Sequence, residues 1–92
     1  MEISSIPIKN KQYYYQKVEN DGFLINSSIG KLKVVNSTGA QVWELIDGQN
    51  SVNDIARILE LTFDITIGEL QSDLINFLQA LFERSLIYLK QE

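Results

Sequence analysis

The fold is decided by the stretch Val34-Val35-Asn36-Ser37-Thr38-Gly39-Ala40-Gln41-Val42-Trp43-Glu44-Leu45-Ile46-Asp47-Gly48, which joins a β-rich first third of the chain to a helical remainder. An extended apolar pair leads into three candidate N-cap residues at 36–38. The helix that follows ends at Asp47-Gly48, because glycine readily adopts the left-handed conformation. Ser51 then begins a second helix. The pattern predicts a strand that leads into a helix-turn-helix.

The first two helices are predicted to be short and amphipathic, at about residues 37–47 and 52–61. Thr38 and Gln41 have the spacing of a capping box at the first helix, and the two residues before Thr38 are alternative caps. Ser51 caps the second helix. The predicted buried stripes are Val42, Trp43 and Ile46 in the first helix, and Val52, Ile55, Ile58 and Leu59 in the second.

The third helix has the clearest start signal and is expected to run from about residue 66 to residue 85. Thr66 and Glu69 make a capping box, and Ile65 and Leu70 are placed for a hydrophobic staple. Its apolar positions cover an arc of about 160°, wider than the roughly 100° that a helix needs to dock on one core. Either this helix touches both the sheet and the other helices, or one of its edges lines a groove for a partner.

The first third of the chain predicts a three-stranded antiparallel meander within residues 6–35. Consecutive strands usually pair, so the first and third strands are expected at the edges. Along the third strand, Leu32 and Val34 share one face and Lys31 and Lys33 the other. A short extended arm at 6–8 and a strand or packed extension at 86–89 complete the chain. The three strands are Gln12–Val18, Phe23–Asn26 and Lys31–Val35.

The length of 92 residues, with 45% hydrophobic and 22% charged residues, is typical of one soluble domain. We therefore expect a single α+β domain over residues 1–92, a winged helix-turn-helix-like fold with a three-stranded antiparallel sheet followed by three helices. No apolar run approaches the length of a membrane span, and the N-terminus lacks the features of a signal peptide. A cytoplasmic protein without membrane contacts is expected.

The chain contains no cysteine and no histidine, which excludes thiolate nucleophiles, disulfides, imidazole bases and the usual zinc sites. Acidic residues such as Asp47 and Asp54 already have turn or capping roles, so we expect no catalytic residue, metal or cofactor. The net charge of −4 argues against binding to nucleic acid. A winged-helix DNA-binding protein would have only Arg57 as a cation on its second helix.

Several short motifs occur in a characteristic order along the chain. They are Asn36-Ser37-Thr38-Gly39-Ala40, Trp43, Ile46-Asp47-Gly48, Val52-x-x-Ile55-Ala56 and Asp73-x-x-x-Phe77-Leu78-x-x-Leu81. With the order of strands and helices, they resemble the pyrroloquinoline quinone biosynthesis protein D family. That family supplies the peptide-recognition elements of ribosomally made, post-translationally modified peptides. The resemblance covers roughly residues 6–89.

Two features compare the chain with branches of the family that it resembles. The second and third strands lack the Pro-Glu step associated with the quinone-cofactor branch, and contain Leu24-Ile25-Asn26 followed by Gly30-Lys31-Leu32. This looks more like the stand-alone members of lasso-peptide pathways. Where the family usually has glycine before the last Leu-Ile, this chain has Ser85, which leaves the end of the third helix open.

The resemblance implies a non-catalytic module that binds the leader segment of a precursor peptide as a strand added to the third β-strand, beside a groove lined by the third helix. It would present the peptide to a separate maturation enzyme, a leader protease in the lasso case. The alternative is a peptide chaperone for quinone-cofactor synthesis or another radical-enzyme pathway. A monomer or a strand-exchanged dimer is expected. The implied leader-binding residues are Lys31, Leu32, Lys33, Val34, Asp73, Asn76, Phe77 and Ala80.

Other interpretations of the same residues remain. Lys31 and Lys33 on an edge strand would also discourage edge-to-edge aggregation. Asp73 fits a solvated charge as well as a groove, and Phe77 fits a core position. A homo-oligomerisation or adaptor module would use the same exposed edge without a leader peptide. A winged-helix DNA-binding protein is the alternative of another functional class.

Overall fold

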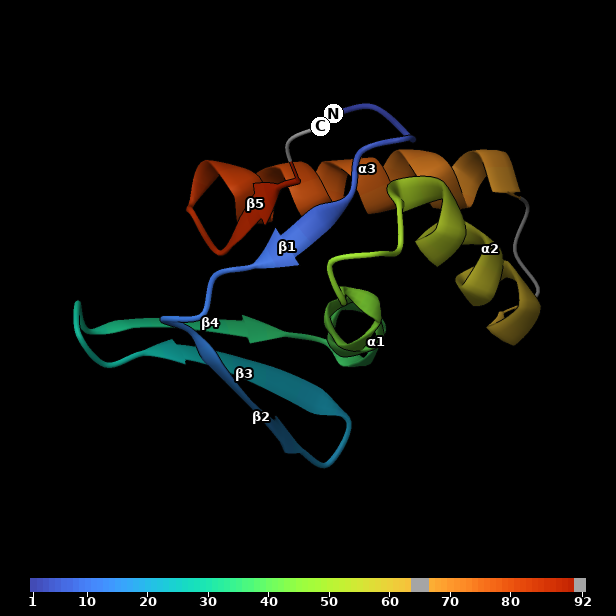
Figure 1. The fold of residues 1–92 in the computed structure, drawn as a ribbon. Helices are drawn as coiled ribbons and strands as arrows, with labels where there is room; N and C mark the ends of the chain where they lie inside the picture. The colour runs from blue at the N-terminus through green and yellow to red at the C-terminus, as the bar shows by residue number, and fades with distance from the viewer. Residues whose placement is uncertain (64–66, 91–92) are drawn as a thin grey trace.

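A three-stranded antiparallel sheet and three helices form the body of the protein, and a two-stranded sheet ties its two ends together (Figure 1). The computed structural model describes residues 1–63 and 67–90. It confirms the predicted α+β class, with a meander sheet followed by three helices. In chain order the elements are β1 (Pro7–Lys9), β2 (Tyr14–Val18), β3 (Asp21–Asn26), β4 (Lys31–Val35), α1 (Ser37–Leu45), α2 (Val52–Thr62), α3 (Ile67–Glu83) and β5 (Ile87–Leu89).

The sheet has the order β2-β3-β4, so β2 and β4 are its edges, as the meander predicts. Lys33 pairs with Leu24 in the register, and directly paired residues of an antiparallel sheet share a face. Leu24 is fully buried beneath the helices, so Lys33 lies on the helix side of the sheet. Leu32 and Val34 lie on the outer face, where their side chains are 61% and 52% exposed. The alternation of side chains along β4 was predicted from the sequence. Its apolar residues, Leu32 and Val34, nevertheless face solvent and not the core.

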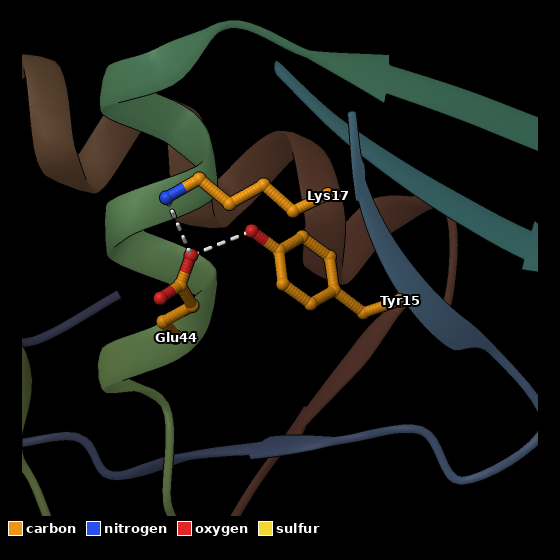
Figure 2. A network of polar contacts seen from close by, with 3 residues as sticks. All are labelled: Tyr15, Lys17 and Glu44. Atoms are coloured by element: carbon orange, nitrogen blue, oxygen red, sulfur yellow. Dashed lines mark hydrogen bonds and ion pairs between the residues drawn. The ribbon is translucent and has the colours of Figure 1, made fainter. Parts of the chain in front are cut away.

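A glycine brings β3 close to α1. A Cβ at Gly22 would lie 2.8 Å from Cε1 of Tyr15, 2.9 Å from Cγ2 of Val35 and 3.2 Å from Cβ of Ala40 in α1. Only glycine therefore fits here without a shift of its neighbours. Beside this contact, the Tyr15 hydroxyl donates a 2.6 Å hydrogen bond to Oε2 of Glu44, and Nζ of Lys17 lies 3.9 Å from the same oxygen (Figure 2). Polar contacts therefore connect β2 to α1 across the sheet.

α1 begins one residue after Asn36, whose side-chain Oδ1 accepts a 2.9 Å hydrogen bond from the N–H of Gly39. The predicted capping box at Thr38 is therefore wrong, and the alternative cap two residues earlier is the one used. The helix ends at Leu45, two residues before the predicted end. Asp47 instead organises the following turn, because its carboxylate accepts the N–H groups of Gln49 and Asn50. These bonds hold the pKa of Asp47 below its usual value.

The N-terminus of α2 is fully hydrogen-bonded, although helices leave their first four N–H groups without internal partners. Ser51 and Asp54 form the predicted capping box, in which the Ser51 hydroxyl accepts the N–H of Asp54 and the Asp54 carboxylate accepts the N–H of Ser51. The N–H groups of Val52 and Asn53 donate to the carbonyls of Ser5 and Ile3, each at 2.9 Å. The N-terminal arm therefore completes the cap of α2.

α3 ends at Glu83, two residues before the predicted end, and Ser85 adopts a left-handed conformation with φ of 61°. The predicted capping box at Thr66 and the staple at Ile65 lie outside the described residues. Leucines at four positions face the core, whereas Phe82 is 40% exposed. The wide apolar arc is therefore only partly used by packing inside the molecule. The buried leucines are Leu70, Leu74, Leu78 and Leu81.

The ends of the chain meet in the β1–β5 pair, which has Pro7 opposite Leu89 and Lys9 opposite Ile87. The core beneath is centred on Trp43, which is 1% exposed. Nζ of Lys9 lies 5.4 Å from the centroid of the Trp43 ring. Burial there lowers the pKa of Lys9, an effect that the charges of nearby acidic residues oppose. Among residues 1–63 and 67–90, no helix is long and apolar enough to cross a membrane.

Candidate functional site

β4 lies at an edge of the sheet, and alternate residues along it direct their backbone groups away from the sheet. The two-residue turn between Val18 and Asp21 makes these a hydrogen-bonded pair. Bonding alternates along the middle strand, so Asp21 and every second residue after it bond to β2, and the intervening residues bond to β4. Leu32 and Val34 pair with residues that bond to β2. Their own N–H and C=O groups therefore point out from the open edge.

A cavity of about 330 Å³ lies at the start of β4. Its lining, taken over the residues that the structure describes, contains three cations and no carboxylate. We call it the cationic cavity. Arg84 follows the end of α3, and Tyr13 precedes β2, so the cavity forms where segments far apart in the sequence meet. Tyr13 is 9% exposed and forms a packed wall. The lining residues are Tyr13, Ile29, Lys31, Leu32, Lys33, Arg84 and Leu86.

A second cavity of about 380 Å³ lies beyond the other end of β4, between the three helices. We call it the interhelical cavity. Apolar side chains form most of its walls, and Asp73 is the one carboxylate among the described residues that line it. A Cβ at Gly39 would lie 3.1 Å from Cζ of Phe77, so the missing side chain lets the Phe77 ring approach the first turn of α1. The lining residues are Asn36, Thr38, Gly39, Val42, Leu59, Leu70, Asp73, Leu74 and Phe77.

The structure divides the eight predicted leader-binding residues into three groups. The first group, Lys31, Leu32 and Lys33, lines the cationic cavity. The second group, Asp73 and Phe77, lines the interhelical cavity. The third group, Val34, Asn76 and Ala80, is exposed and lines neither cavity. The predicted residues that line a cavity therefore lie at opposite ends of β4, those of the strand at its start and those of the helix beyond its end.

Several lining residues were not predicted from the sequence. Among the described residues that line the cationic cavity, Arg84 is the one cation that does not lie on β4, and it follows a helix whose last turn has no basic residue. Its position two residues before Leu86 was a weak signal, because the chain returns toward the sheet only through the left-handed turn at Ser85. Tyr13 belongs to a run of three tyrosines in which alternation alone did not show the buried side. The α1 and α2 walls of the interhelical cavity depend on tertiary packing.

The open edge and the two cavities offer complementary features to an extended peptide. Outward N–H and C=O groups on β4 can pair with an extended peptide, and the two cavities can receive side chains from it. Within the part of the chain that the structure describes, no group of three or more acidic residues could hold a metal ion. The described lining residues combine hydroxyls, cations and the Asp73 carboxylate, and the chain has no histidine or cysteine.

The chain matches the family model of coenzyme PQQ synthesis protein D (PqqD) over residues 21–87, which confirms the resemblance seen in its motifs. TbiB1, whose structure was solved in complex with the TbiA(beta) leader peptide, has a similar fold. The TM-score is 0.82 at 15% sequence identity, and the alignment covers 92% of this chain and 99% of that chain. No match was found among curated proteins.

Proposed function

Since the chain belongs to the PqqD family, we propose that it binds the leader segment of a ribosomally made precursor peptide as a strand added to β4. The observation that carries this proposal is an open edge with a cavity at each end. TbiB1, which has the same fold, binds a leader peptide. An added strand gains main-chain hydrogen bonds along the edge, and pockets for its side chains supply specificity.

The dimensions of the edge suit a short extended segment. β4 has five residues, which at about 3.3 Å each span about 17 Å. A leader strand of five or six residues would therefore reach from the cationic cavity to the interhelical cavity. Leu32 and Val34 would bond to its backbone, while Lys31 and Lys33 would flank its helix-side residues. Phe77 would contact a side chain in the interhelical cavity.

We assign the remaining predicted residues to the same surface with lesser roles. Asp73 lines the interhelical cavity, and would meet a polar or basic group of the leader. Asn76 and Ala80 lie on the exposed side of α3, where a bound strand would pass over them. Small Ala80 leaves room for a leader side chain.

The proposed module does no chemistry of its own and presents the precursor to a separate maturation enzyme. The sequence Leu24-Ile25-Asn26 followed by Gly30-Lys31-Leu32 favours a lasso-peptide pathway, in which the enzyme is a leader protease. The alternative is a pathway in which a radical enzyme modifies the peptide, including quinone-cofactor synthesis. The gene neighbourhood distinguishes them, because a short reading frame beside a protease and an asparagine-synthetase-like cyclase indicates the lasso case.

The direct test is a titration of the isotope-labelled protein with a synthetic leader from the neighbouring short reading frame, followed by amide chemical shifts. We expect the shifts to concentrate in residues 30–36 and 70–84. Shifts confined to α2, or none at saturating peptide, would exclude the assignment. A gel shift on duplex DNA at moderate salt tests the DNA-binding alternative.

A proline at the edge sharpens the test. Leu32→Pro removes an N–H that points away from the sheet, which edge strands tolerate. We expect it to weaken leader binding at least tenfold, because the added strand loses a main-chain bond and meets the proline ring. Leu32→Ala is the matched control, since it removes the same side chain and keeps the N–H. If both variants bind alike, the leader does not use the β4 backbone.

A further inference from the structure

The cationic cavity contains three positively charged side chains that form no ion pair with the described residues. Lys31, Lys33 and Arg84 line it, and none of the described residues adds an acidic side chain to the lining, in a chain whose net charge is −4. Across residues 1–63 and 67–90, the ion pair that the structure contains is the one between Lys17 and Glu44 on the other edge of the sheet. None of the three cavity cations takes part in it. Clustered like charges destabilise one another, and a carboxylate between them would reverse that effect.

Protection of the sheet edge does not explain the whole cluster. Lysines on β4 would discourage pairing with another chain. Arg84, however, comes from the segment after α3 and adds nothing to the edge itself. Its guanidinium is a planar group with paired donors that match the two oxygens of a carboxylate. The lining therefore combines two ammonium groups and one guanidinium around a space of about 330 Å³.

The sheet register determines which residues of a bound strand would meet these cations. Lys31 and Lys33 pair with Asn26 and Leu24, whose side chains are buried on the helix side. A strand residue directly opposite either lysine shares that face. The residue opposite Val35 shares it too and lies beside Gly39 at the interhelical cavity. Because side chains alternate, these helix-side positions are two or four residues apart along the strand.

We propose that the cationic cavity recognises an aspartate or glutamate of the leader peptide. The acid lies on the same face of the added strand as a large apolar residue, two or four positions away, that enters the interhelical cavity. This inference rests on the proposed function, because it requires a peptide strand on β4. It adds the chemical class of the recognised residue and its spacing from the apolar one.

The test uses random ten-residue peptides displayed on phage and selected on the purified full-length protein. The wild type is expected to enrich peptides with Asp or Glu two or four positions from a large apolar residue. The variant Lys33→Glu/Arg84→Glu is expected to lose that acid or to select Lys or Arg in its place. Lys11→Glu/Lys90→Glu is the matched control, because it makes the same charge change at exposed sites outside the cavity.

Binding of one selected peptide gives the size of the effect. Replacing its acid by the corresponding amide is expected to weaken binding about tenfold at low salt, and less as salt is raised, since charge-assisted bonds at a partly exposed site are screened. Arg84→Gln, which removes the positive charge without adding a negative one, should reduce the difference between acid and amide.

The outcomes separate the two proposals. Enriched peptides with apolar residues and no acid would leave the proposed function standing and overturn this inference. Loss of the acid preference in the control variant as well would also overturn it, because the preference would then follow overall charge. Failure of the wild type to enrich any peptide would count against the proposed function itself.

Discussion

Ser85 ends α3 with a backbone conformation that glycine adopts more easily. Its φ is 61°, its N–H donates to the Phe82 carbonyl at 3.0 Å, and the N–H of Leu86 donates to the Leu81 carbonyl at 2.9 Å. These two bonds form a Schellman motif, in which the left-handed residue is usually glycine. The motif directs the chain from α3 into β5 and places Arg84 at the cationic cavity. The strained serine therefore lies at the junction between helix and site.

Ser85→Gly is expected to stabilise the protein by about 1 kcal/mol, because a left-handed residue with a Cβ costs about 1–2 kcal/mol and glycine recovers part of it. In a domain of this size the melting temperature should rise by about 4–8 °C. Urea unfolding measures the change. Ser85→Ala keeps the Cβ and should show no gain. Equal stability of the glycine and alanine variants would show that the left-handed conformation is not strained.

At the scale of elements, features that depend on neighbouring residues were predicted correctly, whereas the choice between equivalent local alternatives was not. The capping box of α2 follows from two side chains three residues apart, and it was predicted correctly. The cap of α1 was not, because three successive residues could each serve. Asn36 is the cap, since its backbone is extended while Ser37 and Thr38 already belong to the helix. The alternation of β4 was also predicted. Its buried side was not, since only pairing with Leu24 places Lys33 on the helix side.

The contact between β2 and α1 predicts a pH dependence of stability. Burial, and then the hydrogen bond to Glu44, raise the pKa of Tyr15 from 10.0 to about 12. A raised pKa means that the folded state favours the protonated phenol. Its contribution is therefore complete below pH 10, the value in the unfolded chain, and is lost as the pH rises toward 12. The contact joining β2 to α1 should weaken in that window.

Unfolding in urea at several pH values from 9 to 12 tests this, with Tyr15→Phe beside the wild type. We expect the wild type to lose more stability than the variant between pH 10 and 12. Tyr14→Phe is the control, because Tyr14 lies on the opposite face of the same strand and is 57% exposed. Parallel losses in the wild type and in Tyr15→Phe would show that this hydroxyl does not link the two elements.

At the scale of the whole molecule, the N-terminal arm connects parts that the sequence did not associate. Its carbonyls at Ile3 and Ser5 cap α2, and its strand β1 pairs with β5. The sequence predicted an extended arm and a short final strand. It did not predict their pairing, because residues about 80 positions apart carry no local signal of contact. The matched family region, residues 21–87, leaves the arm outside. The sequence also did not predict that the site is divided between two cavities, because this division depends on packing between elements that are distant in the chain.

Deletion of residues 1–9 is expected to destabilise the protein by about 3–5 kcal/mol, since several backbone hydrogen bonds worth about 1 kcal/mol each are lost and apolar surface is uncovered. Val52 and Asn53 lose their acceptors, and the fully buried Ile87 loses its partner strand. Because small domains have free energies of unfolding of about 5–15 kcal/mol, the deletion would remove a large part of the protein's stability. Urea unfolding measures the loss, and Ser4→Ala, at an exposed position, is the control. A loss below about 1 kcal/mol, the scale of a single hydrogen bond, would mean that the arm rests on the domain without holding its ends together.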